Sequence, residues 1–304
     1  MCSVLITGAT GFIGSQLLRK IDPARYGNIF CLSRSQSPKI ESFSNTDQFR
    51  FIQGDICEPE AFGSHLASCD TVIHLAATTG KARPEQYFRV NAGGTARLIE
   101  QCEQKGVKNF LYVSTIAVKF ADKTTYPYAQ SKQEGESVLK MSRLNYAIVR
   151  PTIVIGKKAA VWEALSRLAR KRILLMPGDG RVRIQPIHLE DLIDSLLMIL
   201  SGKHFSNEIF EVGGPEEITF EQFLKRIHYF YYGKDPRVVH IPLKPVMTIL
   251  SLVEKYLDIS LPVGAGQFSA FLNDGTIQRN KIFDQLAGRM RDIDRMIQEV
   301  ISSE

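Results

Sequence analysis

The pattern of hydrophobic and polar positions begins with a short apolar run that ends in a glycine-rich turn. Residues 4–6 are Val, Leu and Ile, which predicts a buried strand of a parallel sheet. Gly8, Gly11 and Gly14 follow, and the segment 12–20 has the pattern of a helix. This arrangement predicts a phosphate site, because the first N–H groups of a helix face an anion and missing Cβ atoms let a pyrophosphate approach. A turn that binds no ligand is the alternative.

Apolar runs and helical segments continue to alternate through the first half of the chain. Further strands are predicted over residues 28–32, 49–53, 71–75, 109–114 and 146–150, and a helix is predicted from after Asn91 to Lys105. Repeated strand–helix units are typical of an α/β fold with a parallel sheet. We therefore expect a Rossmann-type, doubly wound parallel sheet with a smaller C-terminal substrate-binding lobe.

The glycine turn carries a family resemblance. It reads TGATGFIG over residues 7–14, with a spacing one residue different from the commoner G-x-G-x-x-G. In this form the sequence resembles the extended short-chain dehydrogenases/reductases, also called NAD-dependent epimerase/dehydratases. Asn91 and the following AGGT match their N-x-x-G-T, and the resemblance reaches to about residue 230. It implies that one loop binds the cofactor through Gly8, Thr10, Gly11, Phe12, Ile13 and Gly14.

The end of the second predicted strand bears on the choice of cofactor. Ser33 stands nineteen residues after Gly14, where an acidic residue would bind the ribose 2′-OH of NAD, and Arg34 follows it. An arginine there accommodates the 2′-phosphate of NADP. The sequence therefore predicts a preference for NADP(H), with NAD(H) as the alternative.

The resemblance implies further cofactor contacts. Asp55 corresponds to the residue that binds the adenine amino group, although it could instead cap a helix around residues 60–66. Ala76 and Ala77 are small enough for the dinucleotide to lie across the strand ends, whereas we expect His74, inside a strand, to be a packed histidine. The remaining implied contacts are Ile56, Leu75, Asn91, Pro151 and Ile153.

A tyrosine and a lysine four residues apart carry the predicted chemistry. Tyr128 and Lys132 project from one face of a helix. Oxidising an alcohol by hydride transfer requires a base, and a nearby ammonium makes a phenol more acidic. Tyr128 is the predicted general acid/base, and Lys132 its electrostatic partner that also holds the nicotinamide ribose. By alignment with the family, Thr115 rather than Ser114 orients the substrate oxygen.

Departures from the family pattern concern the substrate. Lys119 and Phe120 stand where a Tyr-Gly pair is usual, and the loop to Tyr128 is short, so the substrate cannot be transferred by analogy. Ile116 and Ala117 replace the Asp-Glu pair of sugar 4,6-dehydratases, which argues against a dehydratase.

Positive charge is concentrated in one segment. The chain of 304 residues has 44% hydrophobic and 23% charged residues, as an ordinary globular protein does, and a net charge of +6. Residues 157–183 hold eight basic and two acidic residues, which equals that whole excess. The segment indicates a surface for an anionic substrate or an acidic partner, with a solvated helix face as the alternative. No recognition motif for nucleic acid is present.

Cysteine usage and hydropathy bear on location. The five cysteines lie in the first third without metal-ligand spacing, which predicts free thiols, no metal site and a cytoplasmic enzyme. We expect no N-terminal signal peptide, since the first strand runs directly into the glycine turn. The apolar stretch 245–261 is interrupted by charged residues, so no transmembrane segment is expected.

The predicted organisation is a core at residues 1–155 and a mainly substrate-binding lobe at 156–304, with segments around 183–215 returning to the core. Thr219 and Gln222 form a predicted capping box. The aromatic run 229–232 and the amphipathic segment 245–257 either cover the substrate cleft or contact a lipid.

These observations predict an NAD(P)-dependent oxidoreductase or epimerase that acts on a hydroxyl or keto carbon. The favoured substrate is a nucleotide-sugar. One alternative is a reductase or dehydrogenase of a steroid-like or lipid alcohol. Another is a redox-silent NADP(H)-binding subunit or sensor, although relatives of that kind commonly lack the Tyr–Lys pair. A homodimer is possible, and the helices 95–105 and 128–141 are where members of the resembled family pair.

Overall fold

The computed structural model describes residues 2–35, 48–202, 204–242 and 273–303. The chain divides into two compact units whose segments alternate along the sequence. Unit 1 consists of Met1–Thr115, Tyr128–Arg150 and Ile193–Phe210, and unit 2 of Ile116–Pro127, Pro151–Leu192 and Glu211–Glu304. The predicted division at residue 155 is between a cofactor-binding core and a substrate-binding lobe, and this assignment of functions stays a prediction. The amphipathic segment 245–257 lies outside the described residues.

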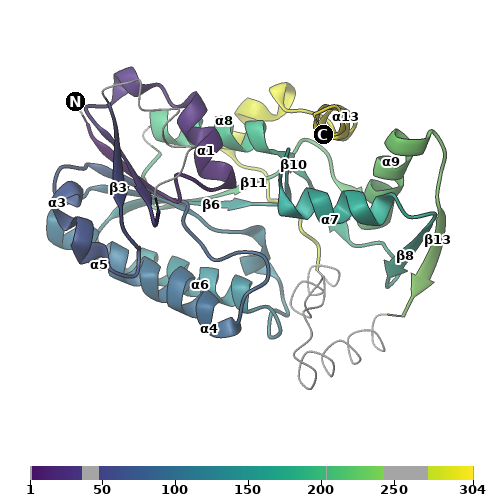
Figure 1. The fold of residues 1–304 in the computed structure, drawn as a ribbon, viewed down its shortest axis with the longest axis horizontal. Helices are drawn as coiled ribbons and strands as arrows, with labels where there is room; N and C mark the ends of the chain where they lie inside the picture. Colours follow the sequence, from purple (N-terminus) through teal and green to yellow (C-terminus); the bar gives the residue numbers. More distant parts are fainter. Residues whose placement is uncertain (1, 36–47, 203, 243–272, 304) are drawn as a thin grey trace. The chain divides into compact units, whose positions relative to one another are not determined.

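A seven-stranded sheet organises unit 1 (Figure 1). Its order is β11-β6-β5-β4-β1-β2-β3. Each pair of neighbouring strands in the series β6-β5-β4-β1-β2-β3 is parallel. The strands are β1 (Val4–Thr7), β2 (Ile29–Ser33), β3 (Phe49–Gln53), β4 (Thr71–His74), β5 (Asn109–Val113), β6 (Asn145–Pro151) and β11 (Glu208–Val212). The order 3-2-1-4-5-6 is that of a doubly wound dinucleotide-binding fold, so the Rossmann-type prediction is confirmed.

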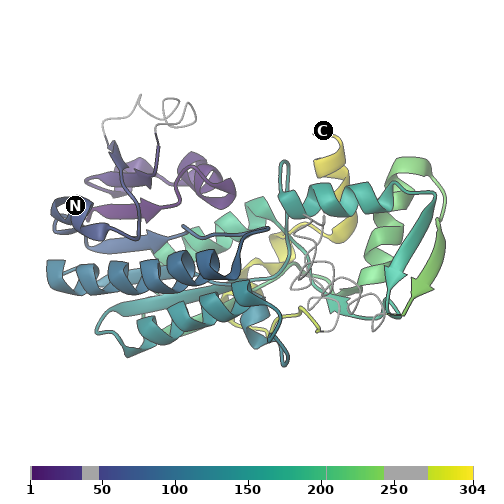
Figure 2. The same cartoon turned by 60° about the horizontal axis from the view of Figure 1, so that its bottom comes forward.

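Helices cover both faces of this sheet. They are α1 (Phe12–Lys20), α3 (Gly63–Leu66), α4 (Pro84–Tyr87), α5 (Thr95–Lys105), α6 (Pro127–Met141) and α8 (Leu189–Ser201), with short turns η1 (Pro23–Arg25), η2 (Pro59–Phe62) and η3 (Phe88–Gly94). Helices α5 and α6 lie side by side on one face (Figures 1 and 2). Helices α1 and α8 lie on the other, where Lys20 and Asp194 form an ion pair of 2.9 Å.

The apolar run at the start of the chain becomes the central strand. Val4, Leu5 and Ile6 are fully buried, because β1 has a strand on each side and helices on both faces. Burial on both faces explains why this run is continuous rather than alternating. The predicted strands of the first 150 residues agree with the structure to within one residue at each end.

The helix before α5 differs from the prediction. Helical structure begins at Pro84 and passes through the π-helical turn η3 before α5 starts at Thr95. A Cβ on Gly94 would lie 3.2 Å from the sulfur of Cys57 and from Ile56. Glycine at this position therefore lets the helix approach the loop that follows β3. The sequence around Gly94 does not predict this contact.

In its described residues, unit 2 contains three two-stranded sheets. β7 (Val154–Ile155) pairs in parallel with β10 (Ile187–His188), β8 (Ile173–Pro177) in parallel with β13 (Arg237–Ile241), and β9 (Arg183–Ile184) antiparallel with β12 (Ile218–Thr219). The helical elements are η4 (Ile116–Lys119), α7 (Ala160–Ala169), α9 (Phe220–Tyr232), α12 (Lys281–Leu286), η6 (Ala287–Arg289) and α13 (Ile293–Ile301).

Two local predictions are confirmed. Helix α9 starts with the predicted capping box, in which the Thr219 hydroxyl accepts from the Gln222 backbone and the Gln222 side chain accepts from the Thr219 backbone. All five cysteines are free thiols, and burial raises the pKa of Cys31 and of Cys69 to about 12. Among the described residues, no helix combines the length and apolar character that crossing a bilayer requires.

Candidate active site

The loop between β1 and α1 is closed by glycines that no other residue could replace without displacing backbone. Gly8 has a φ of +68°, and a Cβ there would lie 2.7 Å from the backbone nitrogen of Ala76. A Cβ on Gly14 would collide with the Gly8 carbonyl oxygen, and the Gly11 N–H donates to that same oxygen at 3.0 Å. The loop is thus a tight turn with exposed backbone at Gly11.

The N-terminus of α1 has the properties of an anion site. Its N-cap, Gly11, contributes no side-chain cap, and the first turn contains no acidic residue. The N–H groups of Phe12 and Ile13 therefore meet no competing carboxylate, and the positive end of the helix dipole stays uncompensated. Together with the glycine turn, this arrangement fits the diphosphate of a dinucleotide. Thr10, Phe12 and Ile13 are all half-buried beside it.

The end of β4 lies directly against this turn. The Thr7 hydroxyl accepts from the Ala76 N–H at 3.2 Å and shares a hydrogen bond of 2.7 Å with His74, whose other ring nitrogen contacts the Thr95 hydroxyl at 2.9 Å. Burial, and then the positive charge of Lys132, lowers the pKa of His74 well below its usual value. The prediction of a packed histidine is confirmed. Leu75, Ala76 and Ala77 are half-buried.

The ends of β2 and β3 hold the residues predicted to meet the adenosine part of the cofactor. Ser33 donates a hydrogen bond of 2.8 Å to the Ser35 carbonyl, and Arg34 is exposed. Asp55 accepts from the Cys57 N–H at 2.9 Å, which closes a turn. It does not cap the helix that follows, because the N-cap of η2 is Glu58. Ile56 is buried, and the contacts of both Asp55 and Ile56 with adenine stay predictions.

Asn91 connects the loop after β4 with helix α6. Its side-chain amide donates to the Thr78 carbonyl at 3.0 Å and to the Ser131 hydroxyl at 3.1 Å, and its oxygen accepts from the Thr78 N–H at 2.7 Å. Ser131 in turn donates to the Tyr128 carbonyl at 2.8 Å. The fully buried Asn91 therefore holds the first turn of α6 in place. A direct contact of Asn91 with the cofactor stays a prediction.

Tyr128 and Lys132 lie one turn apart on α6. Tyr128 is half-buried, and its ring meets that of Tyr87 edge-on at a centroid distance of 6.1 Å. Lys132 is only 1% exposed, and its ammonium lies 4.1 Å from the centre of the Tyr112 ring. Burial lowers the pKa of Lys132 to about 7, with the negative charge of Glu136 acting in the opposite direction.

The strand end that carries the third predicted catalytic residue offers two hydroxyls. Ser114 is 3% exposed, and its backbone N–H donates to the Val149 carbonyl at 2.7 Å. Thr115, the next residue, is half-buried. Greater access at Thr115 is in keeping with the choice made from the sequence, although its catalytic role stays a prediction.

A buried ion pair between α6 and β6 is the main feature that sequence reasoning missed. Glu136 is 1% exposed and accepts two hydrogen bonds from the Arg150 guanidinium, at 2.9 and 2.5 Å. Burial alone would raise the pKa of Glu136, but hydrogen bonds from Arg150 and Ser114 and the positive charges of Arg150 and Lys140 together outweigh burial, so the pKa is lowered. Its position four residues after Lys132, on the same helix face, was the available signal.

The predicted cofactor contacts at and after the end of β6, Pro151 and Ile153, belong to unit 2. Pro151 is buried, and Ile153 is half-buried with its carbonyl accepting from the Ile187 N–H at 2.9 Å. Their contact with the cofactor stays a prediction.

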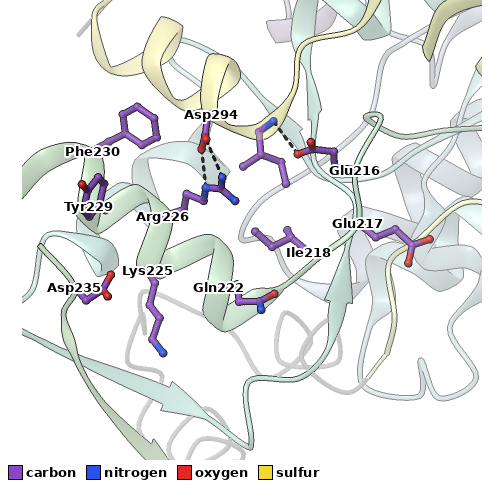
Figure 3. Close-up of a pocket in the computed structure, with 11 residues that line it drawn as sticks. Glu216, Glu217, Ile218, Gln222, Lys225, Arg226, Tyr229, Phe230, Asp235 and Asp294 are labelled. Atoms are coloured by element: carbon purple, nitrogen blue, oxygen red, sulfur yellow. Dashed lines mark hydrogen bonds and ion pairs between the residues drawn. The ribbon is translucent and has the colours of Figure 1, made fainter. Parts of the chain in front are cut away.

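Unit 2 also contains a cavity of about 910 Å³ beside α9, which we call the α9 cavity (Figure 3). Four acidic and two basic side chains line it, and both basic side chains have acidic partners. Arg226 pairs with Asp294 at 2.7 Å, and Lys225 pairs with Glu221 at 2.5 Å. None of the residues predicted to bind cofactor or to catalyse lines this cavity.

Comparison with known proteins gives a consistent picture. The model of the NAD dependent epimerase/dehydratase family matches residues 4–213. The chain is 29% identical over 254 residues to dTDP-D-glucose 4,6-dehydratase of Mus musculus, covering 74% of this chain and 71% of that protein. It is 26% identical over 250 residues to UDP-glucose 4-epimerase of Vibrio cholerae, covering 74% of each. The structure of UDP-glucuronic acid 4-epimerase from Bacillus cereus in complex with NAD has the same fold, with a TM-score of 0.66, 23% identity and coverage of 88% and 96%.

Proposed function

The chain belongs to the NAD-dependent epimerase/dehydratase family, and on that premise we propose that it transfers a hydride to or from a hydroxyl- or keto-bearing carbon of a nucleotide-sugar. The observation that carries the proposal is the pairing of Tyr128 and Lys132 on one face of α6, in the same unit as the glycine turn and the uncapped N-terminus of α1. The glycine turn binds the cofactor diphosphate, and the ends of β2, β3 and β4 line the adenosine part.

A nicotinamide cofactor, when bound, would supply the hydride chemistry, and the residues of this chain would hold and move the proton. Tyr128 takes the proton of the substrate hydroxyl as hydride leaves, and gives it back in the reverse direction. Lowering the pKa of a tyrosine by about three units requires roughly 4 kcal/mol. An ammonium about 4 Å away supplies an energy of that order at an effective dielectric constant of ~20. The protonated form of Lys132 has this role, and Thr115 holds the substrate oxygen in line.

The comparisons support a nucleotide-sugar substrate, since the named relatives act on dTDP-glucose and UDP-glucose. The positively charged segment 157–183 is in keeping with an anionic substrate. Ile116 and Ala117 leave no carboxylate after Thr115 for eliminating water, so epimerisation or net redox is the favoured reaction.

Replacing Tyr128 by Phe tests the proposal. Because the phenol hydroxyl is the proton acceptor, we expect turnover of UDP-glucose, measured as UDP-galactose formed, to fall about 10²- to 10⁴-fold. The dissociation constant of the cofactor should stay within about twofold. Tyr126→Phe is the matched control, because it removes the same hydroxyl two residues away and should leave turnover nearly unchanged. Full activity of Tyr128→Phe would remove the catalytic assignment.

The wild-type enzyme also separates the two remaining alternatives. Reduction of steroid-like or lipid ketones, with no reaction of a panel of nucleotide-sugars, would favour the lipid-alcohol enzyme. Tight binding of NADPH without consumption in either panel would favour a redox-silent subunit or sensor.

Within this function we propose a preference for NADP(H) over NAD(H). The exposed Arg34 and the absence of a carboxylate at Ser33 support it, whereas the similar Bacillus cereus structure contains NAD. We expect NADPH to bind at least about tenfold more tightly than NADH, measured by fluorescence titration. Arg34→Ala should remove most of that difference, and Arg19→Ala, an exposed arginine of α1, should not. Tighter binding of NADH to the wild type would contradict the preference.

Pairing into a homodimer through α5 and α6 and a cytoplasmic location remain predictions. Met141, at the end of α6, is 79% exposed, which is in keeping with an apolar contact there. Light scattering at two protein concentrations tests the dimer.

A further inference from the structure

A second cavity in unit 2 has an unusual charge. It measures about 580 Å³ and lies beside α7, and we call it the α7 cavity. Five basic side chains and one acidic side chain line it: Lys157, Lys158, Arg167, Arg170, Lys171 and Glu163. The remaining lining is mainly apolar, and Trp162 and Val300 close it with only 2% of each residue exposed.

These five cations stay without acidic partners. In the part of the chain that the structure describes, none of them forms an ion pair. Several other cations of unit 2 do have acidic partners. Arg183 pairs with Asp274 and Glu217, Arg291 pairs with Asp191 and Glu299, and the cations of the α9 cavity are neutralised as Figure 3 shows for Arg226. Among the residues that the structure describes, basic side chains therefore outnumber acidic ones five to one around the α7 cavity.

One of the five cations is held in position by aromatic residues. The Arg170 guanidinium lies 4.9 Å from the centre of the Tyr231 ring, and the Tyr231 hydroxyl shares a hydrogen bond of 2.8 Å with Ser166. Ser166 itself lines the cavity. A guanidinium fixed in this way loses less side-chain entropy when it binds an anion than a free one does.

The distribution of the charges sets the shape of the ligand. Lys157 and Lys158 precede α7, and Arg170 and Lys171 follow its last residue, about 15 Å along the axis for ten helical residues. Because the charges lie along the helix rather than at one point, an anion with more than one charged group can contact more of them than a single phosphate can. The volume is that of small-molecule sites, and no exposed aromatic platform for nucleic-acid bases lines it.

We propose that the α7 cavity binds a small molecule that carries a diphosphate group. Arg167 and Arg170 suit bidentate contacts with phosphate oxygens, and the lysines add charge along the length of the anion. The diphosphate has two possible sources. It belongs either to the nucleotide-sugar substrate or to a phosphorylated ligand that is separate from the substrate. The site stands on its lining residues and does not depend on the hydride-transfer reaction.

The test uses inorganic pyrophosphate as the probe, titrated calorimetrically into the whole protein at constant ionic strength. We expect binding to the wild type, and a dissociation constant at least about tenfold higher in Arg167→Gln/Lys171→Gln. The control is Arg295→Gln/Lys234→Gln, which removes the same charge from exposed positions of unit 2 outside this cavity. It should change the dissociation constant by less than about twofold, because long-range attraction is screened by salt.

Several outcomes would overturn the proposal. Absence of pyrophosphate binding to the wild type, or equal weakening by both double variants, would show that the cavity is not a specific site. Binding to anionic phosphatidylserine vesicles without binding of pyrophosphate would point to a membrane-facing surface instead.

A kinetic arm distinguishes the two sources of the diphosphate. If the ligand is the substrate, Arg167→Gln/Lys171→Gln should raise the KM for UDP-glucose with little change in kcat. If the ligand is separate, KM stays unchanged while pyrophosphate binding is lost. Either result supports the site, and calorimetric binding reports on it even if UDP-glucose is not a substrate.

Discussion

At the scale of single residues, Lys132 combines burial with a proposed catalytic task. Its pKa of about 7 means that the folded protein releases the proton of this ammonium near neutrality, whereas an unfolded chain holds it to about pH 10.4. Between these values the unfolded state binds more protons, so the stability of the folded state rises with pH. The destabilisation caused by burying the charge is complete below pH 7 and disappears above the pKa of the unfolded chain.

This linkage predicts a pH dependence. The free energy of unfolding of the wild type, relative to Lys132→Met, should rise between about pH 7 and pH 10 by up to about 1.4 kcal/mol per pH unit. Urea unfolding at several pH values measures it, with Lys140→Met as the same change on the exposed surface of α6. A relative stability that falls or stays flat over this range would contradict the linkage.

The ion pair between Glu136 and Arg150 makes a second prediction at this scale. Arg150→Ala should lower the free energy of unfolding by about 3–5 kcal/mol, because it leaves the carboxylate of Glu136 buried without its main partner. Arg143→Ala is the matched control: that arginine side chain is 93% exposed and lies 3.9 Å from Glu103, so its loss should cost at most about 1 kcal/mol. Equal losses in the two variants would show that the buried pair has no special weight.

At the scale of elements, the ends of helices show what local sequence controls. Helix α1 begins at Gly11 without a side-chain cap, whereas α9 begins with a complete capping box. The uncapped end faces a glycine turn and is assigned to an anion, and the capped end satisfies its own backbone N–H groups. The first backbone N–H groups of a helix need hydrogen-bond acceptors. In α9 the capping box supplies them, whereas the start of α1 leaves room for a ligand to do so.

The capping box of α9 gives a prediction about stability. Thr219→Ala should lower the free energy of unfolding by about 1 kcal/mol, because the Gln222 backbone N–H loses its acceptor. Thr219→Ser retains a hydroxyl and should lose clearly less. Chemical unfolding of both variants measures the effect, and an equal loss in both would attribute it to the methyl group rather than to the cap.

At the scale of the whole molecule, the chain enters each unit more than once. Residues 116–127 belong to unit 2, although the strand end before them and the helix after them belong to unit 1. Residues 193–210 return to unit 1 from a later part of the sequence. Tyr128 therefore sits in unit 1 directly after a segment of unit 2, and a purely linear division of the chain misses this alternation.

The sequence by itself determined the parts of the protein that depend on neighbours in the chain. Apolar runs predicted the strands from β1 to β6, the glycine spacing predicted the turn before α1, and an interval of four placed Tyr128 and Lys132 on one helix face. These features follow from backbone geometry and from burial, which act over a few residues.

Only the tertiary structure decided which polar groups meet. Asn91 forms a hydrogen bond with Ser131, forty residues away, and Arg183 pairs with Asp274, ninety-one residues away. Arg167 has no acidic partner among the described residues. Nothing in the local sequence around these polar residues distinguishes the three cases. The burial of Lys132 against Tyr112, which sets its pKa, is likewise a product of packing α6 onto β5. The physical reason is that pairing and desolvation depend on distances between segments that are remote in the chain, and only the folded arrangement fixes those distances.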